Sequence, residues 1–347
     1  MNAIKHPSIR TLVLTVLAGV VAAVVAGIAL ASRSTARATP IGTGIVDVRT
    51  TLGYEQGAAA GTGIVLTSSG EVLTNNHVIR GATAVRVVIP GAGRSYKAKV
   101  IGYDVSDDVA VLQLSGASNL RTATLGSSSS LKVGQHVTAT GNAGGTGRLT
   151  SATGTITGLG RTITASDEQN GSEQLTGLIE TNAALQPGDS GGPLLDLSNH
   201  VIGMNTAASV GFSFQETAAT DAYAIPINHA LALAKQIESG HSTARVHVGG
   251  TPFLGVQISD GGGFGFGSSA AGGGLVNGVV PGGPASKAGL QAGDVITAIA
   301  GRTVASSSDV LTALLNKTPG TTVKVTWVDG FGNEQSASVT LANGPAL

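Results

Sequence analysis

The stretch Gln186-Pro187-Gly188-Asp189-Ser190-Gly191-Gly192-Pro193 decides the fold, and it sets one serine among small residues. A serine hydroxyl is a poor nucleophile unless a base lies beside it and hydrogen-bond donors face the developing oxyanion. The flanking glycines let the backbone turn sharply and let successive amides converge on one point. We therefore predict that Ser190 is a nucleophile and that the amides of Gly188 and Ser190, with that of Asp189, form an oxyanion hole. A plain Gly-Ser surface turn is the alternative, but the six-residue pattern from Gly188 to Pro193 is too specific to favour it.

His77 is the candidate base for this serine. It follows a run that ends in polar residues, Val72-Leu73-Thr74-Asn75-Asn76, and it precedes a short apolar turn, Val78-Ile79. This arrangement would deliver an imidazole to the edge of a cleft. The other six histidines have no comparable setting. A lone histidine is more often structural, and only its pairing with the serine motif favours a catalytic role.

An acid must orient the imidazole, fix its tautomer and stabilise the imidazolium. The run Asp108-Val109-Ala110-Val111-Leu112 places a carboxylate at the head of an apolar strand. An unpaired carboxylate there would be costly, so a partner is implied. Asp107 is the alternative, but side chains alternate along a strand, and Asp107 should then point toward solvent. We favour Asp108.

Composition excludes several other classes of protein. The chain has no cysteine, which rules out a disulfide framework, a cysteine nucleophile and cysteine-ligated zinc. Lys plus Arg equals Asp plus Glu at 20 each, so no net field attracts nucleic acid. There is no H-E-x-x-H pattern and no other cluster of metal ligands in the sequence. We predict neither a metal nor another cofactor.

The N-terminal segment, residues 1–40, predicts export. Residues 11–32 carry no charge and are mostly Val, Leu and Ala, after Lys5 and Arg10. A membrane-spanning helix needs about 20 apolar residues, whereas a signal h-region has about 7–15. The length favours a transmembrane anchor. Two small-residue patterns, Ala29-Leu30-Ala31 and Ala36-Arg37-Ala38, would also suit a signal peptidase, so tethered and cleaved forms both stay open.

The 347 residues suggest two folded domains after this segment, at about 100–200 residues each. Short β-rich runs alternate with Gly, Ser, Thr and Asn turns between residues 41 and 220, which favours an antiparallel sandwich or barrel. These runs cover residues 63–67, 85–89, 109–114, 137–140, 177–181 and 201–205. Pro226 then opens a helix that should close the first domain, residues 41–239. Its predicted apolar stripe consists of Ile227, Ala230, Leu231, Ala234 and Ile237.

Residues 240–250 are predicted to be a linker, followed by a second domain over residues 251–343. Strands are expected over residues 253–258, 275–280 and 294–300, with two more at the end, and helices after Pro284 and over 310–315. Ser306 and Asp309 have the spacing of a capping box at the start of the second helix. The glycine-rich stretch 261–274 lacks a strand-to-helix phosphate pattern, so we predict a loop and not a nucleotide site.

The segments Thr74-Asn75-Asn76-His77-Val78, Asp108-Val109-Ala110-Val111-Leu112 and Gly188-Asp189-Ser190-Gly191-Gly192-Pro193 together resemble the chymotrypsin-like serine proteases. They are most similar to the HtrA/Deg branch, in which a trypsin-like protease domain precedes a C-terminal PDZ domain. The similarity runs from about residue 41 to the C-terminus. It implies a mainly β fold of two perpendicular six-stranded barrels with the triad His77, Asp108 and Ser190 between them, then an α+β PDZ domain. Many members of the branch have Asn where this chain has Asp189.

The resemblance also implies two binding features. The residue six before the nucleophile, Ala184, would lie at the base of the primary specificity pocket, and it offers no carboxylate to a Lys or Arg substrate side chain. Cleavage after small or medium aliphatic residues such as Val, Ala or Leu is therefore expected. Phe253-Leu254-Gly255-Val256 matches the carboxylate-binding loop of PDZ domains, which captures peptide C-termini. Leu311, Leu314 or Leu315 would supply apolar contacts, unless these leucines are ordinary core and the groove is vestigial.

The expected function is that of an extracytoplasmic serine endopeptidase, membrane-anchored or secreted, that cleaves unfolded or exposed protein segments. Its partners would be polypeptide substrates, C-terminal peptides and, through residues 1–40, the membrane. The alternative is a non-catalytic peptide-binding adaptor or chaperone, which would not need an intact triad. A homo-oligomer is a further expectation. Family trimers make their contacts before the first barrel strand, where this chain has almost no sequence after the anchor, so a trimer is not specifically predicted.

Overall fold

The structure is a computed structural model, and it describes residues 41–54, 57–166, 172–206, 222–243, 245–260, 272–315 and 317–346. The anchor or signal segment expected in residues 1–40 lies outside these residues, as does most of the glycine-rich loop. None of the helices within the described ranges has the length and apolar character needed to span a bilayer.

The first barrel is formed by six antiparallel strands. Strand β5 pairs with β4 and also with β6, which closes the ring β5-β4-β1-β2-β3-β6. The buried interior contains Val48, Tyr103 and Leu112, each at 0% exposure. The strands are β1 (Ile45–Leu52), β2 (Gly57–Val65), β3 (Glu71–Thr74), β4 (Ala84–Val88), β5 (Ser95–Asp104) and β6 (Val109–Leu114).

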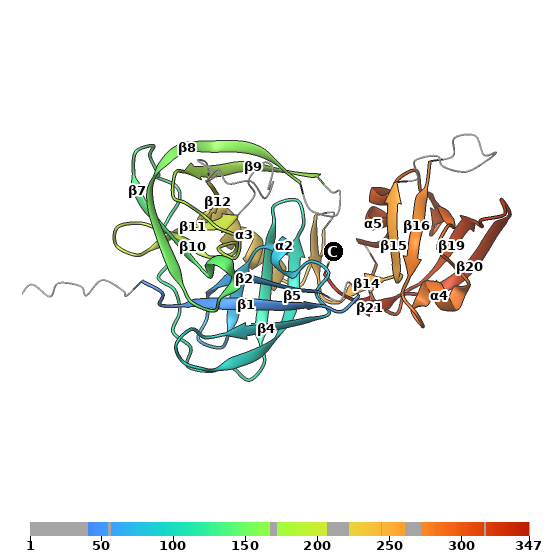
Figure 1. Cartoon of the computed structure of the whole chain (residues 1–347), viewed down its shortest axis with the longest axis horizontal. Helices are drawn as coiled ribbons and strands as arrows, with labels where there is room; N and C mark the ends of the chain where they lie inside the picture. The colour runs from blue at the N-terminus through green and yellow to red at the C-terminus, as the bar shows by residue number, and fades with distance from the viewer. Residues whose placement is uncertain are drawn as a thin grey trace, which may run out of the picture. The chain divides into compact units, whose positions relative to one another are not determined.

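The second barrel is also closed, in the strand order β10-β11-β12-β9-β8-β7. The β8–β9 hairpin forms the long arch labelled in Figure 1. The mainly β fold predicted from the short strands and their turn residues is thus confirmed. The strands are β7 (His136–Gly141), β8 (Thr150–Ser166), β9 (Ser172–Thr181), β10 (Pro193–Leu195), β11 (Val201–Thr206) and β12 (Ala222–Pro226).

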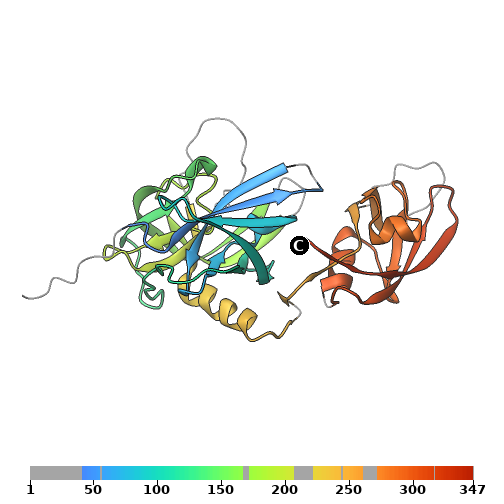
Figure 2. The same ribbon diagram turned by 90° about the horizontal axis from the view of Figure 1, so that it is seen from below.

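Helix α3 (Ile227–Glu238) follows β12 and lies on the outside of the barrels, as Figure 2 shows. It contacts β11 of the second barrel and also β5 and β6 of the first. The stripe that docks contains Ile227, Ala230, Ala234 and Ile237, as predicted from their spacing. Leu233 is also buried, at 9% exposure, whereas Leu231 is only partly buried. Leu233 lies closer to Ala230 around the helix than Leu231 does, at 100° per residue.

The segment predicted to be a linker contains a strand. β13 (Val246–Val248) pairs antiparallel with β5, with Val246 opposite Asp104 and Val248 opposite Gly102. Val246 is 2% exposed and packs in the same apolar cluster as Ile237. Burial of this valine explains why part of the connection pairs with the first barrel.

The C-terminal domain has a sheet in the order β15-β16-β17-β19-β20, with β18 on β17 and a separate β14–β21 pair. The strand predicted over residues 253–258 is split, because Gly255 has φ of +81° and breaks the extended chain. The predicted capping box at Ser306 and Asp309 is confirmed, because the Ser306 N–H donates to Asp309 Oδ2 at 3.0 Å and the Asp309 N–H donates to the Ser306 hydroxyl oxygen at 3.3 Å. The elements are β14 (Thr251–Phe253), β15 (Val256–Asp260), β16 (Gly274–Val279), α4 (Pro284–Ala288), β17 (Val295–Ile299), β18 (Arg302–Thr303), α5 (Ser307–Leu315), β19 (Thr322–Val328), β20 (Glu334–Thr340) and β21 (Ala342–Gly344).

Candidate active site

His77 lies on α2 (Asn76–Ile79), a single turn that follows β3. The next two residues, Val78 and Ile79, are buried at 5% and 0% exposure and anchor this turn in the first barrel. The His77 side chain itself is 40% exposed. The local sequence therefore fixes the backbone of the turn and leaves the imidazole accessible to a substrate.

Asp108 contacts His77 at two points. His77 Nδ1 lies 2.8 Å from Asp108 Oδ2, and the His77 backbone N–H donates to Asp108 Oδ1 at 2.9 Å. The Asp108 side chain is 4% exposed. Because an ionised carboxylate only accepts, the short Nδ1 contact places the ring proton on Nδ1. The other ring nitrogen, Nε2, is then the one able to accept a proton.

Two further groups hold Asp108. The Thr206 hydroxyl, at the end of β11, donates to Asp108 Oδ2 at 3.0 Å, and the Asn75 side-chain amide donates to the Asp108 carbonyl oxygen at 2.9 Å. The Asp108 backbone has φ of 53°, a left-handed conformation that is uncommon for a residue other than glycine. Sequence reasoning missed Thr206, since a strand threonine carries no local signal of such a role.

The Ser190 turn is fixed to both barrels. The Thr62 N–H of β2 donates to the Ser190 carbonyl oxygen at 2.8 Å, and the Gly191 N–H donates to the Asn205 carbonyl oxygen of β11 at 2.9 Å. Ser190 is 5% exposed. Strand β2 also links this turn to the histidine, because a Cβ on Gly61 would lie 2.7 Å from Val78 and 3.2 Å from the Ser190 carbonyl oxygen. Strand β2 therefore contacts both the Ser190 turn and the turn that carries His77.

Two glycines of the turn cannot carry a side chain. Gly188 has φ of +98°, and a Cβ there would lie 2.2 Å from the Asn142 carbonyl oxygen. Gly191 has φ of +81°, and a Cβ there would lie 2.1 Å from the Thr62 carbonyl oxygen. Positive φ and close backbone approach together explain why this turn requires glycine.

The three amides predicted for the oxyanion hole are not equivalent. The Thr62 hydroxyl donates to the Gly188 carbonyl oxygen at 2.7 Å, and the Asp189 N–H donates to the Gln186 carbonyl oxygen at 3.0 Å. The Asp189 amide is therefore engaged within the turn, and this differs from the expectation that it faces an oxyanion. The Gly188 carbonyl and the Asp189 N–H belong to one planar peptide group and point in opposite directions. Because the carbonyl faces the Thr62 hydroxyl, the Asp189 N–H points away from Thr62.

The Asp189 side chain is also turned inward. It is 5% exposed, and its Oδ2 accepts the Gln186 N–H at 2.9 Å. Burial raises the pKa of Asp189, and the Gln186 N–H offsets part of that rise. Gly141 makes room for it, since a Cβ at position 141 would lie 2.6 Å from Asp189 Oδ1. This carboxyl supports the turn and does not contact His77.

Ala184, the residue predicted to lie at the base of the primary specificity pocket, is at the surface. Ala184 is exposed, and its neighbour Ala183 is buried in the core of the second barrel. Residues 207–221, which follow Thr206 directly, lie outside the described residues.

Among the described residues, no group of three His, Asp or Glu side chains could hold a metal ion.

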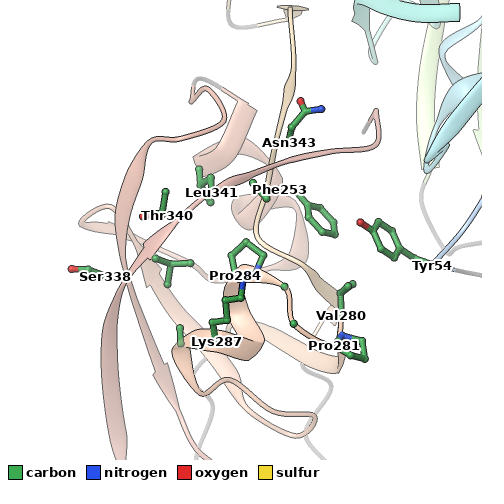
Figure 3. Close-up of a pocket in the computed structure, with 15 residues that line it drawn as sticks. Tyr54, Phe253, Val280, Pro281, Pro284, Lys287, Ser338, Thr340, Leu341 and Asn343 are labelled. Carbon is green, nitrogen blue, oxygen red and sulfur yellow. The ribbon is translucent and has the colours of Figure 1, made fainter.

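The loop predicted to bind a peptide C-terminus joins β14 to β15. Leu254 is buried at 2% exposure, and its carbonyl oxygen accepts the Ala285 N–H, while Gly255 O accepts the Val280 N–H. A Cβ on Gly255 would lie 3.4 Å from the Phe253 ring and 3.4 Å from Pro284, two of the side chains that line the pocket in Figure 3. On α5, Leu314 is core at 5% exposure, whereas Leu311 is 41% exposed. Leu314 therefore supports the domain, and Leu311 is the leucine that is open to solvent.

Comparison with known proteins defines the class of each domain. Residues 61–204 match the trypsin-like peptidase domain family, and residues 252–341 match the PDZ domain family. A probable periplasmic serine endoprotease, DegP-like, from Halomonas elongata is 34% identical over 246 residues, covering 67% of this chain and 46% of the relative. The serine protease PepD of Mycobacterium tuberculosis is 32% identical over 310 residues, covering 86% of this chain and 63% of the relative.

Among solved structures, the HtrA-type protease AlgW with a tripeptide has a TM-score of 0.50 and 30% sequence identity, covering 88% of this chain and 94% of that one. A trypsin-like peptidase domain joined to a PDZ domain is thus the class that the fold and the site define. The chain belongs to the HtrA-type serine proteases. It spans about half the length of the first curated relatives that it matches, at 46% and 54%.

Proposed function

We propose that the protein is a serine endopeptidase in which Ser190 is the nucleophile, His77 the general base and Asp108 the orienting acid. The observation that carries this proposal is the two-point contact between Asp108 and His77, on a turn that shares strand β2 with the Ser190 turn. The curated relatives named above are themselves described as serine proteases.

The chemistry follows from the assigned proton positions. The Ser190 hydroxyl oxygen attacks the carbonyl carbon of the substrate while His77 Nε2 takes the hydroxyl proton, and Asp108 stabilises the resulting imidazolium. The amides of Gly188 and Ser190 would stabilise the oxyanion. His77 then returns the proton to the leaving amine as the peptide bond breaks. Water then attacks the acyl carbonyl carbon while His77 Nε2 takes its proton, the ester bond to the Ser190 oxygen breaks, and His77 returns the proton to that oxygen as the carboxylic acid product leaves.

Covalent labelling tests the proposed nucleophile. A fluorophosphonate should modify the full chain, and mass spectrometry should place the adduct on the peptide that contains Ser190. The Ser190→Ala variant should not react, whereas Ser198→Ala, a change at an exposed serine, should react like the parent. An unlabelled parent, with or without added peptide, would instead favour the peptide-binding adaptor.

We further propose that the enzyme cleaves unfolded or exposed segments after Val, Ala or Leu. The support is Ala184, which introduces no carboxylate near the nucleophile turn that could pair with a basic side chain. One methylene in an apolar pocket is worth only about 1–3 kcal/mol, so the preference should be modest. Digestion of an unfolded protein, with the cleavage sites assigned by mass spectrometry, should show these residues before the cut. Predominant cleavage after Lys or Arg would overturn the assignment.

The C-terminal domain is proposed to bind the C-termini of peptides through Phe253, Leu254, Gly255 and Val256. A peptide would extend the sheet at β15 and place its last apolar side chain near Leu311 of α5. Isothermal titration with apolar-ended peptides should show binding that is lost when the terminal carboxylate is amidated. No heat of binding at millimolar peptide would indicate a vestigial groove.

An extracytoplasmic location is proposed, with residues 1–40 either anchoring the chain in the membrane or being cleaved. The support is the uncharged stretch 11–32 and the similarity to the probable periplasmic serine endoprotease of Halomonas elongata. A reporter enzyme that is active only outside the cytoplasm should be active when fused after residue 40. An inactive fusion would contradict export, and the size of the fused product would distinguish an anchor from a cleaved signal.

A further inference from the structure

The connection between the two domains reaches the turn that carries Asp108. Strand β13 lies on the edge of β5, and its first residue, Val246, is opposite Asp104, the last residue of β5. Because Val246 is buried at 2% exposure, the backbone at this point is fixed. The preceding residue, Arg245, is therefore held at the end of β5, where the turn from Asp104 to Asp108 begins.

Arg245 contacts that turn directly. Its Nη2 lies 2.8 Å from Asp107 Oδ2, and His229 Nε2 of α3 lies 3.4 Å from the same oxygen. The Asp107 side chain is only 13% exposed, whereas those of Arg245 and His229 are 58% and 48% exposed. Asp107, which sequence alternation predicted to face solvent, is instead paired with two cationic or ionisable groups from outside the barrel.

The turn is also held from inside. Asp104 is 1% exposed, and its Oδ1 accepts the Asp107 N–H at 3.0 Å, while the Asp108 N–H donates to the Val105 carbonyl oxygen at 3.3 Å. Burial raises the pKa of Asp104, and the Asp107 N–H and the Arg245 guanidinium offset part of that rise. The Asp107 backbone N–H is thus hydrogen-bonded to Asp104, and the Asp107 carboxylate is paired with Arg245.

These two contacts of Asp107 matter because the next residue, Asp108, is under backbone strain. Asp108 has φ of 53°, and such a conformation persists only where the surrounding structure imposes it. A relaxed turn would let the Asp108 carboxylate withdraw from its two contacts with His77. We propose that Arg245 is a positioning residue that holds the Asp104–Asp108 turn so that Asp108 faces His77. This inference rests on the proposed endopeptidase function.

A purely structural role would predict something different. Because the Arg245 side chain is 58% exposed, its ion pair with Asp107 is largely screened by solvent, and removal of the guanidinium should change thermal stability only slightly. Misplacement of a catalytic group by a fraction of an ångström, in contrast, slows the chemical step without weakening substrate binding. The signature of positioning is therefore a lower kcat at constant KM, with an altered pH profile.

The test compares two matched arginines in the full chain. Arg245→Gln should lower kcat about threefold to tenfold with KM unchanged, and it should move the acidic limb of kcat/KM to lower pH. The pH shift follows because a less well-placed carboxylate stabilises the His77 imidazolium less. Arg161→Gln is the control, since Arg161 is 53% exposed and bonds Glu180 at 3.0 Å with the same 13% exposure of the acid. Arg161→Gln should leave both kcat and the acidic limb of kcat/KM unchanged.

Two additional variants sharpen the result. Arg245→Lys keeps the charge and should restore part of kcat, and Asp107→Asn combined with Arg245→Gln should be no slower than the slower single variant. Unchanged kcat and acidic limb in Arg245→Gln, or an equal effect of Arg161→Gln, would overturn the inference. The His77 ring titration followed by nuclear magnetic resonance does not require turnover. It should shift to lower pH in Arg245→Gln even if the parent hydrolyses nothing, which separates this inference from the proposed function.

Discussion

Alanine at Ser190 is expected to lower kcat by about 10⁶, and alanine at His77 to lower it by a similar factor. The two changes should not add. The hydroxyl is reactive only while the imidazole takes its proton, and the imidazole has no role in the chemistry without the hydroxyl. The double variant should therefore retain the same residual rate as either single variant, supplied by the amide donors and by substrate binding.

The measurement is peptide hydrolysis under single-turnover conditions, with each variant first checked for an unchanged thermal transition. Ser198→Ala and His136→Ala, both at exposed positions, serve as matched controls and should behave like the parent. A Ser190→Ala variant that retained a tenth of the parent activity would rule out Ser190 as nucleophile. A double variant that was slower by the product of the two factors would show that the residues act independently.

Asparagine at Asp108 is expected to reduce kcat by about 10⁴, the loss seen when the acid of another triad is made an amide. The geometry here gives the reason. The Asp108 carboxylate accepts from three donors, namely the His77 N–H, the His77 ring and the Thr206 hydroxyl. Asparagine has one acceptor oxygen, so one donor must face its NH₂ group. If this is the ring nitrogen, His77 adopts the other tautomer and its Nε2 can no longer accept the serine proton.

Asp107→Asn is the matched control for this prediction, because it makes the same chemical change one residue away. It should lower kcat by no more than about tenfold, through the turn and not through the tautomer. Steady-state kinetics across pH would compare the two variants. Equal losses in both would show that Asp108 has no special relation to His77, and a loss smaller than tenfold in Asp108→Asn would contradict the tautomer argument.

Much of this fold could be predicted from local sequence because its signals are local. The run from Asp108 to Leu112 is apolar enough to require a buried strand, and β6 begins at Val109 as expected. The capping box at Ser306 and Asp309 is likewise a short-range pattern, and it forms. The glycines around Ser190 predict a turn with positive φ and close backbone contacts, and Gly188 and Gly191 both have positive φ and lie close to neighbouring backbone.

Other features could not be predicted, because they depend on contacts between distant segments. The Asp189 amide turns away from the predicted oxyanion hole because the Thr62 hydroxyl, 126 residues earlier, holds the preceding carbonyl. The strand in the expected linker forms because β5 continues beyond its pairing with β4, so residues 102–104 can pair with β13, and because Val246 packs into a buried site beside them. The hydrogen bond from Thr206 to Asp108 likewise joins the end of β11 to the turn before β6, two segments whose sequences give no sign of each other.

The support for Asp108 from Thr206 has a consequence for how the chain matures. The histidine and the acid belong to the first barrel, which can close as soon as β6 has paired with β5, but the hydroxyl donor and the Ser190 turn come from the second. During synthesis from the N-terminus, the first barrel can therefore be complete before Ser190 and Thr206 have been made. Under the proposed mechanism, a nascent chain would therefore be unable to cleave its half-folded neighbours until the strands of the second barrel have been made.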